Sequence, residues 1–316
     1  ATFVVLGADV LTGSTLQHSS LLGLSPLTAG RFYGFGNIAY AVFVTVALVL
    51  AGALAQAALH RDSSIAGPPP TRPAAAESGP EAADDDTAAT GRRARRRAFW
   101  IVVVIGLVTI ALDGAPFAGA DFGGVIASVC GFSLLALAVA QSRPSWLRLV
   151  GIAVGAAVLV SAIAVFDWLR PAAERTHLGE FVQQVLDGEA GTVVWRKGTN
   201  ALRTFDRPFY GWLVPLAYAL IISMVKAPER LHVPGLAVVF RRWPLLRPLI
   251  WAGLVTGAVG FAANDSGVIV PALMLTVGIP LVVAAVARAH RLALDASPAP
   301  PAATGPTPPS RSPTRH

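Results

Sequence analysis

Hydrophobic residues occur along the chain in long runs separated by polar segments, and this pattern predicts membrane-spanning helices. A helix needs about 20 apolar residues to cross the hydrocarbon core, with a range of about 17–25. We therefore expect an all-α, polytopic transmembrane helix bundle of about seven full spans after a truncated first span at Ala1–Gly7. The full spans are predicted at Ile38–Leu59, Ala98–Leu112, Phe122–Ala140, Leu149–Phe166, Phe209–Val225, Leu249–Ala263 and Val268–Ala287.

Two features refine the expected packing of these spans. Ala98–Leu112 and Leu249–Ala263 are short, so they reach full length only if flanking residues lie at the depth of the membrane interface. Glycines recur at a spacing of four residues in Gly151–Gly155 and Gly253–Gly257. Small residues at this spacing permit close approach of neighbouring helices, so we expect both pairs to lie at helix contacts.

The segments outside the runs divide the chain into four parts. Residues 1–59 hold the truncated span, an outer loop and the first full span, and residues 98–291 form the transmembrane bundle. Residues 60–97 are rich in Pro, Ala and charged residues, and residues 292–316 are rich in Pro. Segments of this kind bury too little apolar surface to fold. We expect a disordered cytoplasmic loop and a disordered cytoplasmic tail there.

The loop 167–208 has a different pattern from these polar segments. Apolar residues recur at helical spacing between Leu178 and Leu186, and polar residues fill the opposite face. This predicts an amphipathic helix that lies on the outer membrane surface or covers the bundle. Gly188 and Gly191 then interrupt the pattern, and a second, weaker helix follows them.

Composition agrees with a membrane protein and excludes other classes. The 316 residues are 54% hydrophobic and 14% charged, whereas soluble domains carry about 25% charged residues. The single cysteine excludes a disulfide framework and a cysteine-based zinc site. The chain opens at Ala1 inside an apolar stretch, so we interpret it as the C-terminal part of a longer protein.

The basic residues define the expected orientation. If every span crosses the bilayer, the arginine-rich flanks all fall on one side, which the positive-inside rule assigns to the cytoplasm. They include Arg92–Arg97, Arg143 and Arg148, the loop from Lys226 to Arg247, and Arg288 with Arg291. This predicts a multi-pass plasma-membrane protein with a cytoplasmic C-terminus and the lipid bilayer as partner. The net charge of +7 is explained by topology, so we expect no nucleic acid partner.

Acidic residues gather on the opposite, outer side. Each helix predicted to run outward ends in an aspartate, at Asp9, Asp113, Asp167 and Asp265, and Asp121 begins a returning helix. An aspartate at a helix C-terminus opposes the helix dipole, and one near hydrocarbon is costly. The repetition therefore suggests a shared functional purpose, although polar boundary turns explain it as well.

Cationic and polar residues accompany these acids. Arginine suits phosphate or carboxylate groups, and histidine moves protons near neutral pH. In a transferase, Asp113, Asp121 or Asp265 would act as general base or metal ligand, and His177 would shuttle a proton. The candidate substrate-binding residues are Arg31, Tyr33, Asn37, Arg170, Arg175 and Asn264. Pairing of the arginines with the aspartates within the loops is the structural alternative, and the sequence identifies neither a cofactor nor a metal.

Three functions are compatible with this layout. The first is an integral membrane protein with an outward-facing polar site that handles an anionic lipid-linked or phosphorylated cell-envelope substrate. The second is a transporter or channel with an outer acidic vestibule, although no span carries an ionisable residue at its centre. The third is a membrane anchor for a missing upstream domain. Whether the protein is an enzyme is left open.

Four short motifs carry a resemblance to a known group. They are Gly30–Asn37 (GRFYGFGN), Gly119–Gly124 (GADFGG), Arg175–Gly179 (RTHLG) and Asn264–Gly267 (NDSG). Together they resemble the membrane portion of a group of bacterial, actinobacterial-type polytopic membrane proteins, some of which carry an alkaline-phosphatase-like upstream domain. The resemblance implies a cell-envelope location and no particular activity. The layout alone is similar to that of outward-facing glycosyltransferases and O-antigen ligases.

Overall fold

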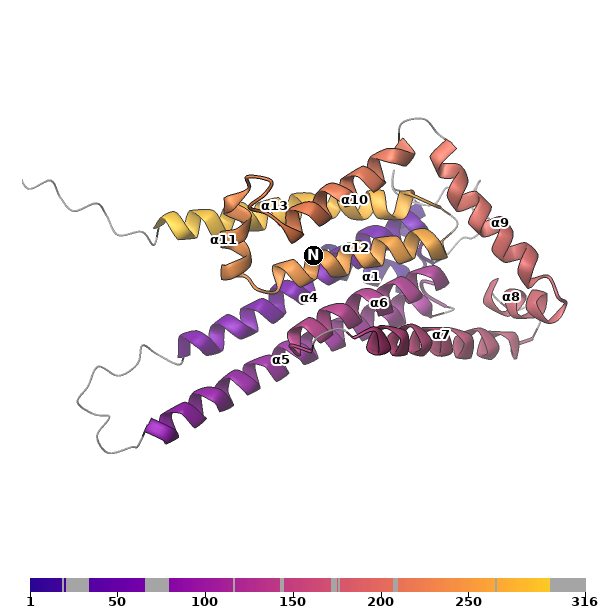
Figure 1. The fold of residues 1–316 in the computed structure, drawn as a ribbon. Coiled ribbons are helices and arrows are strands. Elements are labelled where there is room, and N and C mark those ends of the chain that lie inside the picture. Colours follow the sequence, from indigo (N-terminus) through magenta and orange to yellow (C-terminus); the bar gives the residue numbers. More distant parts are fainter. Residues whose placement is uncertain are drawn as a thin grey trace, which may run out of the picture.

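The computed structural model describes residues 1–18, 20, 34–65, 80–115, 117–142, 145–171, 175, 177–206, 210–264 and 266–295, and these form helices and turns without a strand. Figure 1 shows their arrangement as a bundle of long helices with shorter helices at both ends. The helices are α1 (Thr2–Leu11), α2 (Thr15–His18), α4 (Asn37–Ile65), α5 (Pro80–Gly114), α6 (Phe122–Val139), α7 (Trp146–Trp168), α8 (His177–Leu186), α9 (Ala190–Arg203), the 3₁₀ turn η3 (Thr204–Asp206), α10 (Tyr210–Lys226), α11 (Pro234–Arg242), α12 (Leu246–Ala263) and α13 (Ile269–Asp295).

Within these described residues, six helices are long and apolar enough to cross a membrane: α4, α5, α6, α7, α12 and α13. The end of α9 with η3 and helix α10 are together apolar enough for a seventh crossing, but the two parts meet at a bend of 94°. Helix α1 is apolar but shorter than a span. The expectation of an all-α polytopic membrane bundle is confirmed.

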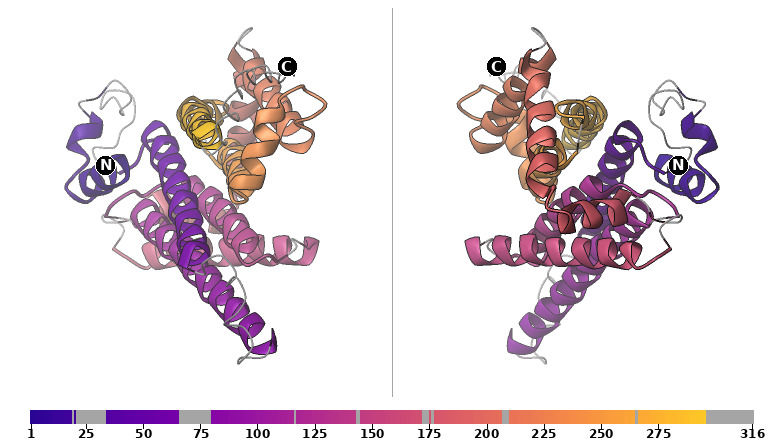
Figure 2. Two further views of the ribbon diagram at one scale, coloured as in Figure 1. Left: turned by 90° about the vertical axis from the view of Figure 1, so that its left-hand side faces the viewer. Right: turned by 90° about the vertical axis from the view of Figure 1, so that its right-hand side faces the viewer.

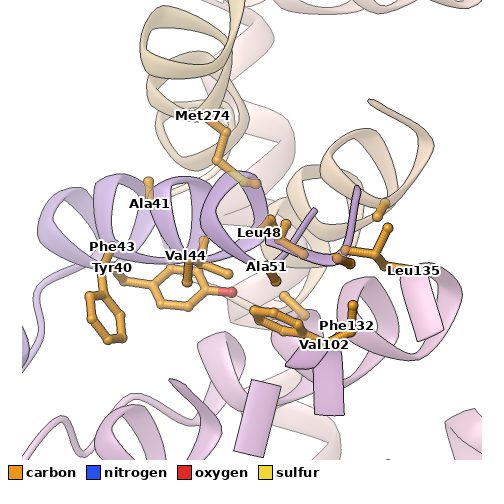
Figure 3. Close-up of a cluster of buried hydrophobic side chains, with 14 of the residues drawn as sticks. Tyr40, Ala41, Phe43, Val44, Leu48, Ala51, Val102, Phe132, Leu135 and Met274 are labelled. Carbon is orange, nitrogen blue, oxygen red and sulfur yellow. The ribbon is translucent and has the colours of Figure 1, made fainter. Parts of the chain in front are cut away.

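Helix α4 lies at the centre of the bundle and packs against α5, α6, α12 and α13, with α1 on its flank. Its apolar side chains Tyr40, Phe43, Val44 and Leu48 are buried, at no more than 2% exposure. In Figure 3 the side chains of α4 meet Val102 of α5, together with Phe132 and Leu135 of α6 and Met274 of α13. Burial in lipid gives no hydrophobic gain between helices, so close side-chain packing is what stabilises these contacts.

Glycine allows the closest approach between helices α6 and α12. A Cβ added at Gly131 of α6 would collide with the buried hydroxyl of Thr256 of α12. At the contact between α12 and α13, a Cβ added at Gly260 would lie 2.8 Å from Val270. Gly257 also lies at a contact, with Tyr218 and Pro271, whereas Gly253 has nothing within 4 Å. The predicted pair Gly151 and Gly155 likewise has nothing within 4 Å of an added Cβ, so the expectation of a helix contact there is wrong. The reason is that most of α7 is not buried against the bundle, and both glycines lie on its exposed part. Figure 2 shows α7 extending away from the rest of the bundle.

Two segments that we expected to be disordered are helical where the structure describes them. Helix α4 continues to Ile65, and α5 begins at Pro80, so residues 60–65 and 80–97 of the predicted loop are helix. The segment is rich in alanine, a strong helix former, and its acids lie toward the positive N-terminal end of the α5 dipole. Helix α13 ends at Asp295, and residues 296–316 of the predicted tail lie outside the described residues.

The loop 167–208 contains the two predicted amphipathic helices. They are α8, which has the apolar spacing found between Leu178 and Leu186, and α9, which follows the Gly188 turn. Figure 1 shows both at the same end of the bundle as the C-terminus of α7. The loop therefore has a definite fold of its own.

Candidate functional site

One end of the bundle gathers most of the candidate residues. We call it the polar end, and define it by the starts of α4, α6 and α13 and the ends of α5, α7 and α12 (Figure 1). Contacts between distant segments bring these termini together. The Asn37 amide at the start of α4 donates to the hydroxyl of Ser266, just before α13. An added Cβ at Gly123 of α6 would collide with Asn264 at the end of α12.

The turn between α5 and α6 folds back over the end of α5. The amides of Gly119 and Asp121 donate to the carbonyls of Leu112 and Asp113, at 2.8 and 2.9 Å. These carbonyls belong to the last turn of a helix and have no partner within it. Gly119 lies so close to them that a Cβ would collide with both oxygens. The turn therefore satisfies the helix end and leaves no room for a side chain at position 119.

The segment that leads into α4 rests on this turn. The amide of Phe35 donates to the carbonyl of Gly119 at 2.8 Å, and a Cβ at Gly34 would lie 2.5 Å from the same oxygen. Gly34 also has a φ of +91°, which favours glycine. The hydroxyl of Ser14 receives the Gly34 amide at 3.1 Å, which ties the N-terminal helices to the same point. Two chain segments thus cover the end of α5.

Asp113 lies beneath this cover. Its side chain has 0% exposure, and neither carboxylate oxygen has a hydrogen-bond partner among the described residues. A Cβ added on Gly124 of α6 would collide with the Asp113 carboxylate and with the ring of Tyr40, so both side chains lie against Gly124. The Tyr40 hydroxyl donates instead to the Gly124 carbonyl at 3.0 Å and lies 3.2 Å from Ser128 Oγ. Asp113 is therefore a buried acid to which none of the described residues donates a hydrogen bond.

Asp121 has a structural partner close by. It precedes α6 as the N-cap residue, and its Oδ1 accepts the Gly124 amide at 3.1 Å. This is the usual role of an aspartate at a helix N-terminus. Asn264 ends α12 and is 7% exposed, and its Nδ2 is a buried donor without a partner among the described residues. With respect to the described residues, the polar end thus holds a carboxyl group without a donor in Asp113 and an amide donor without an acceptor in Asn264.

Asp9, near the N-terminus of the chain, accepts hydrogen bonds from the start of helix α2 in a similar way. Its carboxylate accepts the amides of Leu16 and Gln17 at 2.8 and 3.2 Å, and the Gln17 side chain at 3.2 Å. It is 3% exposed. The acid that the sequence marked as a helix-ending residue therefore serves the start of the next helix, α2.

Asp167 and two arginines form a second group at the end of α7. Arg170 Nη1 lies 3.2 Å from Asp167 Oδ1, and Asp167 Oδ2 accepts the Gly179 amide of α8 at 2.9 Å. Arg175 donates to the carbonyl of Arg170 at 3.1 Å and lies over the ring of Trp168, 5.4 Å from its centroid. The candidate phosphate-binding residues Arg170 and Arg175 are therefore engaged in holding the loop to α7, which is the structural alternative raised above.

Four candidates lack a described side chain. Arg31, Tyr33 and Asp265 lie outside the described residues, and His177 begins α8 but its side chain is outside them. Asn37 and Asn264 lie together at the polar end, with Asp113 and Asp121 on the adjoining α5–α6 turn. Among the described residues no three His, Cys, Asp or Glu side chains are grouped as a metal site would require.

Four of the acids are less accessible than the expected outward-facing polar site implies. Asp9, Asp113, Asp121 and Asp167 are all buried, with at most 6% exposure. The reason is that the chain folds back at these helix ends, or the acid caps the next helix. Both arrangements satisfy terminal backbone groups that have no partner within their helix and none in lipid. The sequence also did not identify Tyr40, Gly124 and Ser266 as parts of this end. The glycines of the GADFGG and NDSG motifs were the available signal, since each supports a close contact.

Comparisons with known proteins give no direct assignment for this arrangement. No protein-family model, curated protein or solved structure matches the chain. The function of the polar end must therefore be inferred from the residues that it contains. They are the buried acid Asp113, the helix-capping acid Asp121 and the amide side chains of Asn37 and Asn264. Arg170 and Arg175 are engaged in neighbouring contacts.

Proposed function

We propose that this multi-pass membrane protein is a transporter or channel that holds a proton or a small cation at Asp113. The observation that carries the proposal is the buried carboxyl group of Asp113, whose two oxygens have no donor among the described residues. An uncompensated negative charge at such a position costs several kcal/mol. A proton or a cation on the carboxyl group removes that cost.

The surroundings of Asp113 favour a positive occupant over an anionic one. Asp121 lies on the same turn, and the nearest polar groups, Tyr40 and Ser128, are neutral. Arg170 and Arg175, at the end of α7, are committed to Asp167, Trp168 and the loop backbone. The charged groups of the α5–α6 turn are thus two acids, Asp113 and Asp121, and these favour a positive occupant.

We further propose that the polar end faces outward in the plasma membrane and that the C-terminus is cytoplasmic. The support is the distribution of basic residues along the bundle. Lys226 ends α10, Arg241 lies in α11 and Arg247 lies in the first turn of α12. All three are at the end of the bundle opposite to the polar end, where the positive-inside rule expects the cytoplasm. The C-terminal half of α13 runs to that same end, beyond Arg288.

Ion flux in proteoliposomes tests the proposal. The purified protein is reconstituted, and uptake of H⁺, Na⁺ and K⁺ is followed with indicator dyes under an imposed membrane potential. We expect flux of one of these ions, and a loss of at least about tenfold in Asp113→Asn, which removes the charge and keeps the shape. Asp187→Asn is the matched control, because Asp187 is exposed beyond α8. Wild-type flux no greater than that of empty liposomes, or equal flux in both variants, would contradict the proposal.

An enzyme acting on an anionic lipid-linked or phosphorylated substrate is the second candidate. It is favoured by the two outer helices α8 and α9, whose exposed Leu186, Trp195 and Leu202 would lie in the lipid headgroup region beside the polar end. Its test is turnover of a polyprenyl-phosphate-linked sugar by the reconstituted protein. Turnover that is lost in Asp113→Asn, with no ion flux in the wild type, would favour the enzyme over the transporter.

A further inference from the structure

A cavity of about 710 Å³ lies at the end of the bundle opposite to Asp113. It is formed by the end of α10, the turn that follows, helix α11 and the start of α12. Its volume falls within the range of small-molecule sites in proteins, about 300–1,000 Å³. It is separate from the polar end and does not depend on the function proposed for that end.

The lining of this cavity is strongly basic. Four cations, one from each of these four segments, line it, against one carboxylate, that of Glu229. The cations are Lys226, Arg230, Arg241 and Arg247. Within the part of the chain that the structure describes, none of the four has a carboxylate within 4.0 Å. Like charges that converge without counter-ions repel one another, and an anion in the cavity removes that repulsion.

Aromatic contacts help to hold two of these cations in place. Lys226 Nζ lies 5.9 Å from the ring centroid of Trp251, and the Arg247 guanidinium lies 5.0 Å from that of Phe240. Phe240 itself lines the cavity. Side chains positioned in this way lose less conformational freedom when an anion binds than freely moving ones would. The cations are therefore partly arranged before any ligand arrives.

We infer that this cavity binds a phosphate group. Arginine presents a planar pair of N–H donors that fits phosphate oxygens, and lysine adds a point charge. Two sources supply a phosphate at the end of a membrane bundle: an anionic phospholipid of the adjacent leaflet, and a soluble phosphate compound. Basic pockets between membrane helices bind lipid headgroups on the cytoplasmic side. Simple topology-setting arginines would not need to converge on a cavity.

The test compares two double variants of the full chain in detergent. Arg241→Gln/Arg247→Gln removes two lining cations. Arg242→Gln/Arg291→Gln removes two cations that are exposed at the same end but do not line the cavity. Binding of phosphatidylglycerol and of phosphatidylcholine is measured by native mass spectrometry. Binding of inorganic phosphate and pyrophosphate is measured by thermal shift.

We expect the lining variant to bind the phosphate-bearing probe about 25-fold more weakly, at roughly fivefold for each of the two cations. The control variant should bind within about twofold of the wild type. Loss restricted to phosphatidylglycerol identifies a lipid site, and loss restricted to inorganic phosphate or pyrophosphate identifies a soluble ligand. The inference is overturned if the two double variants lose binding equally. It is also overturned if phosphatidylcholine binds as tightly as phosphatidylglycerol and neither soluble anion binds.

Discussion

The contact between α6 and α12 allows a direct test of the packing. Gly131→Ala places a methyl group against the buried Thr256, whose hydroxyl donates to the Ala252 carbonyl at 2.8 Å. The new carbon would also lie 3.3 Å from Thr256 Cβ and 3.4 Å from the Ala252 oxygen. Since the backbone of α12 cannot move aside freely, we expect a cost of about 1–3 kcal/mol from overpacking.

Gly155→Ala on α7 is the matched control for this variant. An added Cβ there meets nothing within 4 Å, so only the gain in helix propensity remains, about 1 kcal/mol in water-soluble helices. The difference between the two variants isolates the overpacking. At about 2–4 °C per kcal/mol for soluble domains of 150–250 residues, the Tm values should differ by about 2–12 °C.

The assay is thermal unfolding of the purified protein in detergent, followed by size-exclusion fluorescence. Thr256→Ala removes the hydroxyl that the new methyl group meets, so Gly131→Ala/Thr256→Ala should recover most of the lost Tm. A non-additive recovery of this kind identifies a direct contact between the two positions. If Gly131→Ala and Gly155→Ala shift the Tm equally, the close crossing of α6 and α12 is refuted.

Two further predictions concern the turns at the polar end. Gly34→Ala should destabilise the protein by about 1–3 kcal/mol, because it combines a left-handed φ with a collision at the Gly119 carbonyl. Gly13→Ala, at a φ of +98° with nothing within 4 Å, should cost less, and equal Tm losses would contradict the collision. Asp121→Ala should cost about 0.5–2 kcal/mol through loss of the α6 cap, whereas Asp121→Asn should retain most of it. The Tm of each variant measures this, and an unchanged Tm in Asp121→Ala would show that the cap contributes nothing.

The long apolar runs made the membrane bundle predictable from the sequence. A run of about 20 apolar residues has few stable arrangements other than a helix in lipid. The amphipathic spacing around Leu178–Leu186 similarly predicted α8. Alternation of helix direction then predicted that Asp113, Asp121 and Asn264 lie at one end of the bundle. The contacts of Gly123 with Asn264 and of Gly124 with Asp113 agree with this.

The burial of the acids was not predictable in the same way. Whether Asp113 faces water or protein depends on the turn that folds back through Gly119 and on Gly34, a residue far away in the sequence. Periodicity carries no information about such contacts between distant segments. The same reason explains the Gly151–Gly155 pair, since a small-residue face permits a contact but does not supply the partner helix. The helical start of α5 was missed because charge and proline content outweighed its alanines.

The central claim is that distant parts of the chain meet at one polar end of the bundle, and cysteine cross-linking tests it most directly. Asn37 and Ser266 are 229 positions apart and hydrogen-bonded by their side chains. In a Cys130→Ala background, oxidation should join Asn37→Cys to Ser266→Cys. A control pair of Asn37→Cys and Arg242→Cys, which lie at opposite ends of the bundle, should stay unjoined. Failure of the first pair to cross-link under conditions that join the second would contradict the account.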